Sequence, residues 1–188
     1  MCKYFSNVLV VGGTGRNTGK TTLVEQLIRK FKDQYTVVAL KTSMLLPGEE
    51  YLHGRHLLKK SDTFFIYEED NSEGKKDSQR FLKAGAKKSY FISANSNKAF
   101  GIAMQELLPK QDSRILIIVE SNVILDYIKP AVFLMVVGEN MNKPKYSDLL
   151  NKADKLIIAM NKISFNRVVD TIDVKTNKLG ILKIEFIP

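Results

Sequence analysis

The chain has 188 residues, of which 44% are hydrophobic and 26% are charged, values typical of one globular domain. Its one cysteine, Cys2, excludes an internal disulfide and a zinc site made of several thiolates, and favours a reducing, cytoplasmic setting. The longest unbroken apolar run, Ala131–Val137, has seven residues, whereas a membrane-spanning helix needs about 20. We therefore predict a single cytoplasmic domain over residues 1–188 with no membrane segment.

The formal net charge is +9, which raises the question of a polyanionic partner. The lysines are scattered, many of them in pairs, and no aromatic RNA-binding signature accompanies them. This pattern favours a basic surface around a site for a small anion and makes nucleic acid an unlikely partner.

Short apolar runs rich in branched residues alternate along the chain with helix-like stretches. Nearly continuous apolar runs are typical of strands that are buried on both faces, as in parallel sheets. The predicted strands are Val8–Val11, Val37–Leu40, Tyr90–Ile92, Ile115–Val119, Ala131–Val137 and Leu156–Met160. Apolar residues with a 3.6-residue period predict helices over Lys20–Phe31 and Phe100–Leu108. The alternation predicts a three-layer, doubly wound α/β fold with a mostly parallel sheet.

The stretch from about residue 45 to residue 76 has the least regular pattern. It contains Pro47-Gly48 and a Gly74-Lys75-Lys76 turn, and we expect an insertion or mobile loop there, followed by a short helix near Asp77–Ala84. The alternating Ile181–Ile187 segment predicts an edge strand.

The strongest chemical signal is the glycine-rich segment Gly12–Thr22, between the first predicted strand and the first predicted helix. Backbone N–H groups of such a loop turn inward around an anion, and the helix N-terminus adds the positive end of its dipole. In this interpretation Lys20 contacts the β and γ phosphates of ATP or GTP, and the hydroxyl of Thr21 binds Mg²⁺. The candidate nucleotide-binding residues are Gly13, Gly15, Arg16, Asn17, Thr18, Gly19, Lys20, Thr21 and Thr22. The alternative is a simple glycine turn, because the G-x-x-x-x-G-K-[ST] spacing would require glycine at Thr14.

Other candidate residues follow the predicted strands, whose carboxyl ends form the ligand-binding edge of an open α/β sheet. Glu120 directly follows an apolar run and is the candidate catalytic and metal-binding carboxylate beside Lys20; alternatively it is the first exposed residue after a strand. Lys41 is expected to hold a second, anionic ligand across the crevice from the glycine loop, or to be a surface lysine. Asp77 either approaches the metal or second ligand or caps a helix. Asn161 is a candidate for binding the base, or a loop asparagine.

These segments resemble known families. The Gly13–Thr21 spacing resembles the longer phosphate loop of dethiobiotin synthetases in the SIMIBI branch of P-loop proteins. The wider pattern resembles the molybdopterin-guanine dinucleotide biosynthesis protein B family: the loop, Lys41, the Gly74–Ser78 and Lys83–Ala86 segments, and Ile117–Glu120. This chain has Ser121-Asn122 where that family tends to have glycine. The resemblance implies a P-loop NTPase fold, Mg²⁺ with ATP or GTP, a homodimer, and molybdopterin or a molybdenum-cofactor enzyme as partner.

We therefore expect a weak nucleoside triphosphate hydrolase or nucleotide-dependent accessory factor in molybdenum-cofactor biosynthesis. The first alternative is a dethiobiotin synthetase-like ligase or small-molecule kinase, in which Lys41 holds the group that receives the γ-phosphoryl. The second is a non-catalytic adaptor whose affinity for its partner depends on the bound nucleotide.

Overall fold

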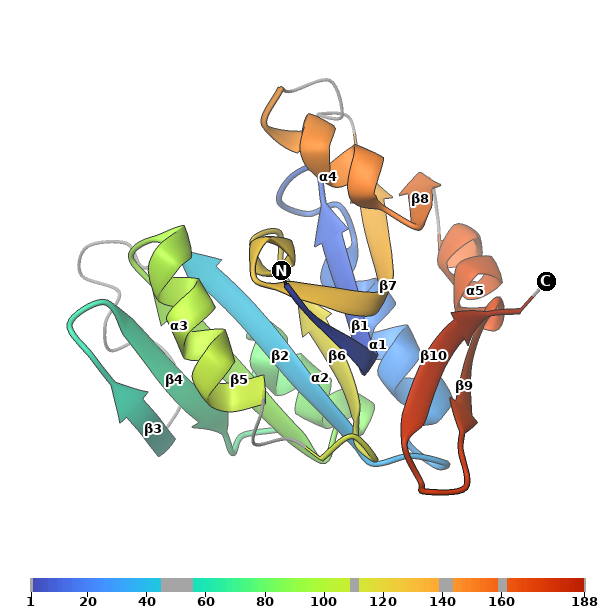
Figure 1. Cartoon of the computed structure of the whole chain (residues 1–188), viewed down its shortest axis with the longest axis horizontal. Helices are drawn as coiled ribbons and strands as arrows, with labels where there is room; N and C mark the ends of the chain where they lie inside the picture. Colours follow the sequence, from blue (N-terminus) through green and yellow to red (C-terminus); the bar gives the residue numbers. More distant parts are fainter. Residues whose placement is uncertain (1, 45–55, 109–111, 139–143, 159–161, 188) are drawn as a thin grey trace.

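The computed structural model describes residues 2–44, 56–108, 112–138, 144–158 and 162–187, in which strands and helices alternate (Figure 1). The strands are β1 (Lys3–Gly13), β2 (Val37–Met44), β3 (His56–Lys60), β4 (Phe64–Glu69), β5 (Lys88–Ala94), β6 (Leu116–Glu120), β7 (Ile128–Val137), β8 (Lys155–Ile158), β9 (Ile172–Thr176) and β10 (Leu182–Phe186). The helices are α1 (Lys20–Phe31), α2 (Asp77–Ala84), α3 (Asn97–Leu107), α4 (Ser147–Lys152) and α5 (Lys162–Asp170), with short 3₁₀ turns η2 (Ile124–Asp126) and η3 (Pro144–Tyr146).

Eight strands form the main sheet, in the order β3-β4-β5-β2-β6-β1-β7-β8. From β5 to β8 all neighbouring strands are parallel, whereas β3 and β4 run antiparallel to their neighbours. The chain is therefore an α/β protein with a mostly parallel, mixed sheet of eight strands flanked by helices, as the alternation of patterns predicted. In this order β6 lies between β1 and β2, which brings the carboxyl ends of three strands together at one edge.

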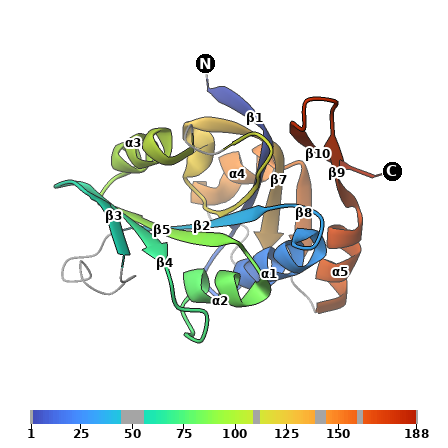
Figure 2. The same ribbon diagram turned by 90° about the horizontal axis from the view of Figure 1, so that it is seen from below.

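Helices cover both faces of the sheet. In Figure 2, α1, α2 and α5 lie on one side of the strands, and α3 and α4 lie on the other. Alternate residues of β1 point to the two sides, so that Leu9 and Val11 pack with α1 while Val8 and Val10 pack with α3. Every residue of β6 is buried, which fits the apolar run Leu116–Val119 that precedes Glu120. The apolar stripe of α1, from Leu23 to Phe31, faces the sheet and holds the helix against it.

Part of the stretch 45–76, where an insertion or mobile loop was expected, is regular in the structure. The described part of that stretch contains β3 and β4, an antiparallel pair that extends the sheet beyond β5. The run Phe64–Tyr67 is buried on both faces and pairs with β5, so it is a sheet strand and not a loop. This strand was missed, although Phe64–Tyr67 is an apolar run like those of the predicted strands, because the turn-forming and charged residues around it indicate a loop. Residues 45–55 lie outside the described residues.

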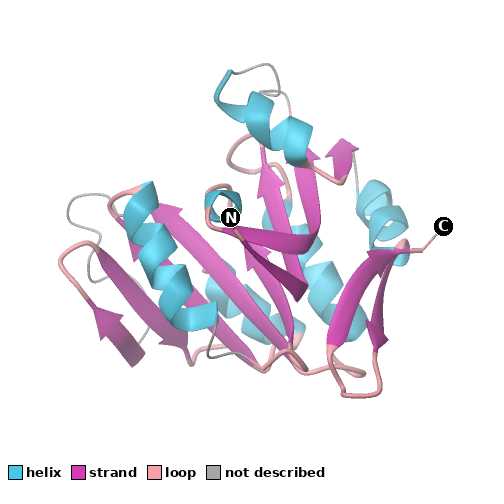
Figure 3. Ribbon diagram, in the orientation of Figure 1, coloured by secondary structure: helices cyan, strands magenta, loops and turns pink. Residues whose placement is uncertain are grey.

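The predicted C-terminal strand exists as β10, but it does not lie at the edge of the main sheet. It pairs with β9 in a separate two-stranded antiparallel sheet (Figure 3). Its apolar side chains Leu182 and Ile184 join the core that surrounds α1. Lys30, near the end of α1, donates to the carbonyl oxygens of Val169 (2.8 Å) and Ile172 (2.6 Å). The C-terminal segment thus completes the packing around the first helix.

Candidate functional site

The glycine-rich loop joins β1 to α1 and leaves the N-terminus of that helix uncapped. Gly19 is the N-cap residue and has a left-handed backbone, with φ of 93°, which favours glycine. A Cβ atom there would lie 2.6 Å from the ring of Phe165, so a side chain is also excluded by space. No side chain caps α1 and its first turn has no acidic residue. Its first N–H groups can therefore donate hydrogen bonds to an anionic ligand.

The loop is held at its start by neighbouring strands. Asn122, just after β6, accepts a hydrogen bond from Gly13 N (2.8 Å) and donates one to Gly13 O (2.9 Å). Thr14 N donates to Val136 O at the end of β7 (3.0 Å), and the hydroxyl of Thr14 accepts from Gly138 N (2.8 Å). These contacts fix the path of the backbone before it turns around the site.

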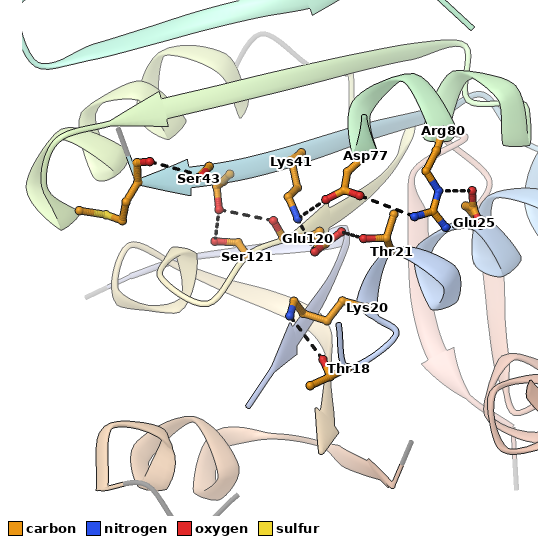
Figure 4. Close-up of polar contacts among 12 residues, drawn as sticks. Thr18, Lys20, Thr21, Glu25, Lys41, Ser43, Asp77, Arg80, Glu120 and Ser121 are labelled. Atoms are coloured by element: carbon orange, nitrogen blue, oxygen red, sulfur yellow. Dashed lines mark hydrogen bonds and ion pairs between the residues drawn. The ribbon is translucent and has the colours of Figure 1, made fainter. Parts of the chain in front are cut away.

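Lys20, the first residue of α1, folds back over the loop. Its Nζ donates to Gly15 O (2.5 Å) and to the hydroxyl of Thr18 (3.4 Å), as Figure 4 shows in part. A Cβ atom on Gly13 would lie 2.8 Å from Lys20 Cδ, so only glycine leaves room for this side chain. Burial lowers the pKa of Lys20; the charge of Glu120 opposes this shift and that of Lys41 adds to it. A bound phosphate would supply the counter-charge that the loop carbonyl does not.

Glu120 is the centre of the polar contacts at this edge of the sheet. It ends β6, and its side chain is only 2% exposed. One carboxylate oxygen accepts from the hydroxyl of Thr21 (2.9 Å), and the other is paired with Lys41 at the carboxyl side of β2. Lys41 also contacts Asp77, with 2.7 Å between Nζ and Oδ2 (Figure 4). A buried charge without a partner is costly, so Lys41 stabilises Glu120 in place.

The chain of charges continues from Asp77 to α1. Arg80 lies one turn after Asp77 on α2, with 3.7 Å between Nη1 and Oδ1, and donates two hydrogen bonds, of 3.0 and 3.1 Å, to Glu25. Burial would raise the pKa of Asp77, but the hydrogen bond and charge of Lys41 outweigh it and hold that pKa below its usual range. Carboxylates and cations thus alternate from β6 through β2 and α2 to α1, which ties the site to both helices.

These side chains surround a cavity of about 520 Å³, within the size range of small-molecule sites. A second, smaller cavity of about 170 Å³ shares four lining residues with the first: Lys20, Lys41, Ser43 and Glu120. The large cavity is lined by Arg16, Asn17, Thr18, Gly19, Lys20, Thr21, Thr22, Lys41, Ser43, Asp77, Arg80 and Glu120. The small one is also lined by Thr42, Ser43, Met44, Phe100, Ser121, Asn122 and Val123.

The structure brings most of the candidate residues together. The loop residues from Arg16 to Thr22 line one cavity with Lys41, Asp77 and Glu120. Gly13 and Gly15 lie behind it and contact Asn122 and Lys20 through their backbones. Lys41, which was expected across the crevice from the loop, borders the same cavity as Lys20. Asn161 lies outside the described residues.

Three polar residues of the site were missed by sequence analysis. Arg80 had a signal, because its spacing of three residues from Asp77 places both on one face of a helix. Asn122 was noted only as a departure from a family pattern, although it follows directly on the strand that ends in Glu120. Glu25 had no local signal, since its partner Arg80 lies 55 residues away in the sequence.

The oxygen atoms at the site suit a hard divalent cation. Within the described ranges, no group of three or more His, Cys, Asp or Glu side chains is placed to hold a metal ion. Mg²⁺ does not require one, because it is commonly held by one or two carboxylates together with waters and substrate phosphates. Thr21, Glu120 and Asp77 supply a hydroxyl and two carboxylates on the rim of the large cavity, and these donors fit Mg²⁺.

Comparisons with protein-family models, with curated proteins and with solved structures find no match for this chain. The architecture defines the class of protein. It is an α/β protein with a mostly parallel, mixed eight-stranded sheet and a charged cavity at one edge of that sheet. Among the described residues, no helix has the length and apolar character needed to cross a membrane.

Proposed function

We propose that this chain is a P-loop protein that binds Mg²⁺ with ATP or GTP at the cavity between the glycine loop and Glu120. The observation that carries the proposal is the hydrogen bond of 2.9 Å between Thr21 and Glu120. It joins the residue that follows the loop lysine to a buried carboxylate on the adjacent strand β6. A phosphate loop and a carboxylate in this relation are the parts that P-loop NTPases use for Mg²⁺ and triphosphate.

The roles of the side chains follow from their positions. The N–H groups at the start of α1 would hold phosphate oxygens, with Lys20 leaving Gly15 O to contact the β and γ phosphates. Thr21, Glu120 and Asp77 would hold Mg²⁺, which when bound neutralises charge on the transferring phosphate. Glu120 would also orient water beside the terminal phosphate.

The activity that we propose is slow hydrolysis or nucleotide-dependent action on a partner. The resemblance to the molybdopterin-guanine dinucleotide biosynthesis protein B family favours an accessory role in molybdenum-cofactor biosynthesis, carried out as a homodimer in the cytoplasm. Molybdopterin or a molybdenum-cofactor enzyme is the partner that this hypothesis requires.

A small-molecule kinase or ligase is the second candidate, and the smaller cavity favours it. That cavity of about 170 Å³ opens on Lys41 and Glu120 and is lined by the hydroxyls of Thr42, Ser43 and Ser121. A second small substrate bound there would lie next to the terminal phosphate. Release of the diphosphate only when a second substrate is present would favour this candidate over hydrolysis.

The experiment that tests the proposal is a thermal-shift panel of ATP, GTP and CTP, each with and without Mg²⁺. A ligand at 100 times its dissociation constant stabilises a folded protein by about 2.7 kcal/mol, enough to raise the unfolding temperature measurably. We expect stabilisation by at least one purine triphosphate, and a larger one with Mg²⁺. The absence of any stabilisation at millimolar concentrations, confirmed by calorimetry, would contradict the proposal.

A further inference from the structure

The ammonium group of Lys41 lies between the carboxylates of Glu120 and Asp77. This group contacts Glu120 Oε1 and lies 2.7 Å from Asp77 Oδ2, while the other oxygen of Glu120 is held by Thr21. The Lys41 side chain is 18% exposed, so the contact is largely shielded from water. A positive charge thus already occupies the place between the two carboxylates.

Arg80 and Lys20 also line the cavity, but their side chains make contacts elsewhere. Arg80 donates both of its hydrogen bonds to Glu25 and approaches Asp77 from the far side, at Oδ1. Lys20 is turned toward the loop, where Gly15 O accepts its hydrogen bond. Among these three cations, Lys41 is the one in direct contact with Glu120.

We infer that Lys41 is a resident cation that closes the metal position until nucleotide arrives. The carboxylates of Glu120 and Asp77 carry two negative charges, and a divalent ion bound to both must displace the ammonium between them. Binding of the metal ion alone is weakly favourable, because the ion replaces the ammonium of Lys41 and leaves that ammonium without a partner. Phosphate oxygens add ligands for the metal and a new partner for the displaced ammonium, which favours the exchange only when nucleotide is present.

The arrangement has a consequence for order of binding. Free Mg²⁺ binds weakly to the protein, and metal enters together with nucleotide. Lys41 then turns toward the large and small cavities, both of which it lines, and can contact an anion there. The same side chain is a counter-ion before nucleotide binds and a ligand-binding group afterwards.

The test measures Mn²⁺ binding to nucleotide-free protein by electron paramagnetic resonance. We expect Lys41→Met to bind Mn²⁺ at least tenfold more tightly than the wild type, because Glu120 then lacks its paired cation and Asp77 retains only Arg80, at 3.7 Å. Lys41→Arg, which retains a cation, should stay close to the wild type. Adding Glu120→Gln to Lys41→Met should remove the gain. Equal affinities of the wild type and a folded Lys41→Met protein would overturn the inference.

Lys59→Met is the matched control, since Lys59 is paired with Glu106 on the surface, away from both cavities. It removes a lysine from one carboxylate and should leave Mn²⁺ affinity unchanged. A gain in Lys59→Met equal to that in Lys41→Met would show a general charge effect and overturn the inference.

Folding of the variants is checked by circular dichroism. Lys41→Gln, whose amide can still donate to a carboxylate, provides a second neutral variant with the same expected gain. If both neutral variants are unfolded without metal, Mn²⁺ should restore the wild-type spectrum, and failure to do so would overturn the inference.

The inference rests on the proposed metal and nucleotide site, but its main measurement uses no nucleotide. If the wild type binds no nucleotide while Lys41→Met gains Mn²⁺ affinity, the proposed function fails and the resident-cation inference stands. If nucleotide binds with Mg²⁺ but Lys41→Met shows no gain, the inference alone fails.

Discussion

Two buried carboxylates end strands of the same sheet, and their surroundings differ. Glu120 ends β6 and Glu69 ends β4, with exposed fractions of 2% and 6%. Both are connected to α2: Glu69 accepts from the Ser78 hydroxyl (3.0 Å), and Glu120 is joined through Lys41 to Asp77. They are alike in burial but not in place, because β4 runs antiparallel to β5: Glu69 lies toward the amino end of β5, whereas Glu120 lies at the carboxyl end of the parallel strand β6.

The difference lies in the kind of partner and in the space beside it. Glu69 accepts hydrogen bonds from two neutral donors near in sequence, the Ser78 hydroxyl and the Asn71 N–H (3.3 Å). Glu120 is held by Thr21 and Lys41, 99 and 79 residues away, and lines both cavities. A carboxylate held by neutral donors is a fixed part of the fold, whereas one paired with a side-chain cation beside open space can exchange that cation for a ligand. Burial alone does not distinguish the two.

The sharpest contrast is expected between Glu120→Gln and Glu69→Gln in nucleotide turnover. The amide in place of Glu120 keeps the shape and removes the charge that orients metal and water, so hydrolysis should fall by about 100-fold with nucleotide still bound. Dependence on Mg²⁺ should weaken as well. Glu69→Gln should turn over like the wild type. Steady-state rates and Mg²⁺ titrations measure both, and equal rates for the two variants would remove the functional role of Glu120.

The nucleotide affinity of Lys20→Ala tests whether the cavity beside Glu120 is the phosphate site. Charge-assisted contacts to phosphate contribute about 1.5–3 kcal/mol, so triphosphate affinity should fall about tenfold or more. The fold should stay intact, because the Lys20 amine contacts the loop and no apolar core. Calorimetry with ATP and GTP gives the affinities. Unchanged binding would mean that the loop does not hold the phosphates.

For Glu69→Gln the expected effect is on the stability of the fold and not on turnover. In Glu69→Gln the amide nitrogen replaces one acceptor, so one of the two buried hydrogen bonds is lost. The expected cost is about 1–2 kcal/mol of unfolding free energy, measured by urea denaturation. Glu69→Asp, which keeps the charge but shortens the side chain, is a useful control. No loss of stability in Glu69→Gln would show that its contacts are replaceable.

The smallest effect is expected from the pH dependence of Asp77. Because the pKa of Asp77 is lowered in the folded state, its ionised form stabilises the fold above its ordinary pKa, and this contribution is lost as pH falls through the lowered value. The wild type should exceed Asp77→Asn in stability by less than about 1 kcal/mol at pH 6, with the difference shrinking as pH falls below the ordinary pKa of an aspartate. Urea titrations at several pH values measure it. A difference that grows on acidification would contradict the assignment of the Lys41–Asp77 contact.

The sequence predicted the parts of the fold that repeat a simple pattern. The helices Lys20–Phe31 and Asp77–Ala84 have the predicted bounds, because their apolar stripes and flanking turns are local signals. The β3–β4 pair and the β9–β10 hairpin were missed or misplaced, since pairing partners of antiparallel strands are set by tertiary contacts. For the site, chain order placed Lys20, Thr21 and Glu120 at one edge. It could not show that Lys41 contacts Glu120 and Asp77, because that contact depends on β6 lying between β1 and β2.

The hydrogen bonds from Lys30 to the carbonyls of Val169 and Ile172 bear on the stage of synthesis at which helix α1 can be held in its folded position. They join residues 139 and 142 positions apart, and the core around α1 also contains Phe165 and Ile184. Because a ribosome releases the chain from its N-terminus, the helix that carries the glycine loop emerges long before the segment that covers it. The nascent chain can therefore contain the loop sequence early, but the contacts that hold helix α1 in place form only after α5, β9 and β10 have been synthesised. If the loop binds nucleotide as proposed, that binding should require these C-terminal elements as well as the loop.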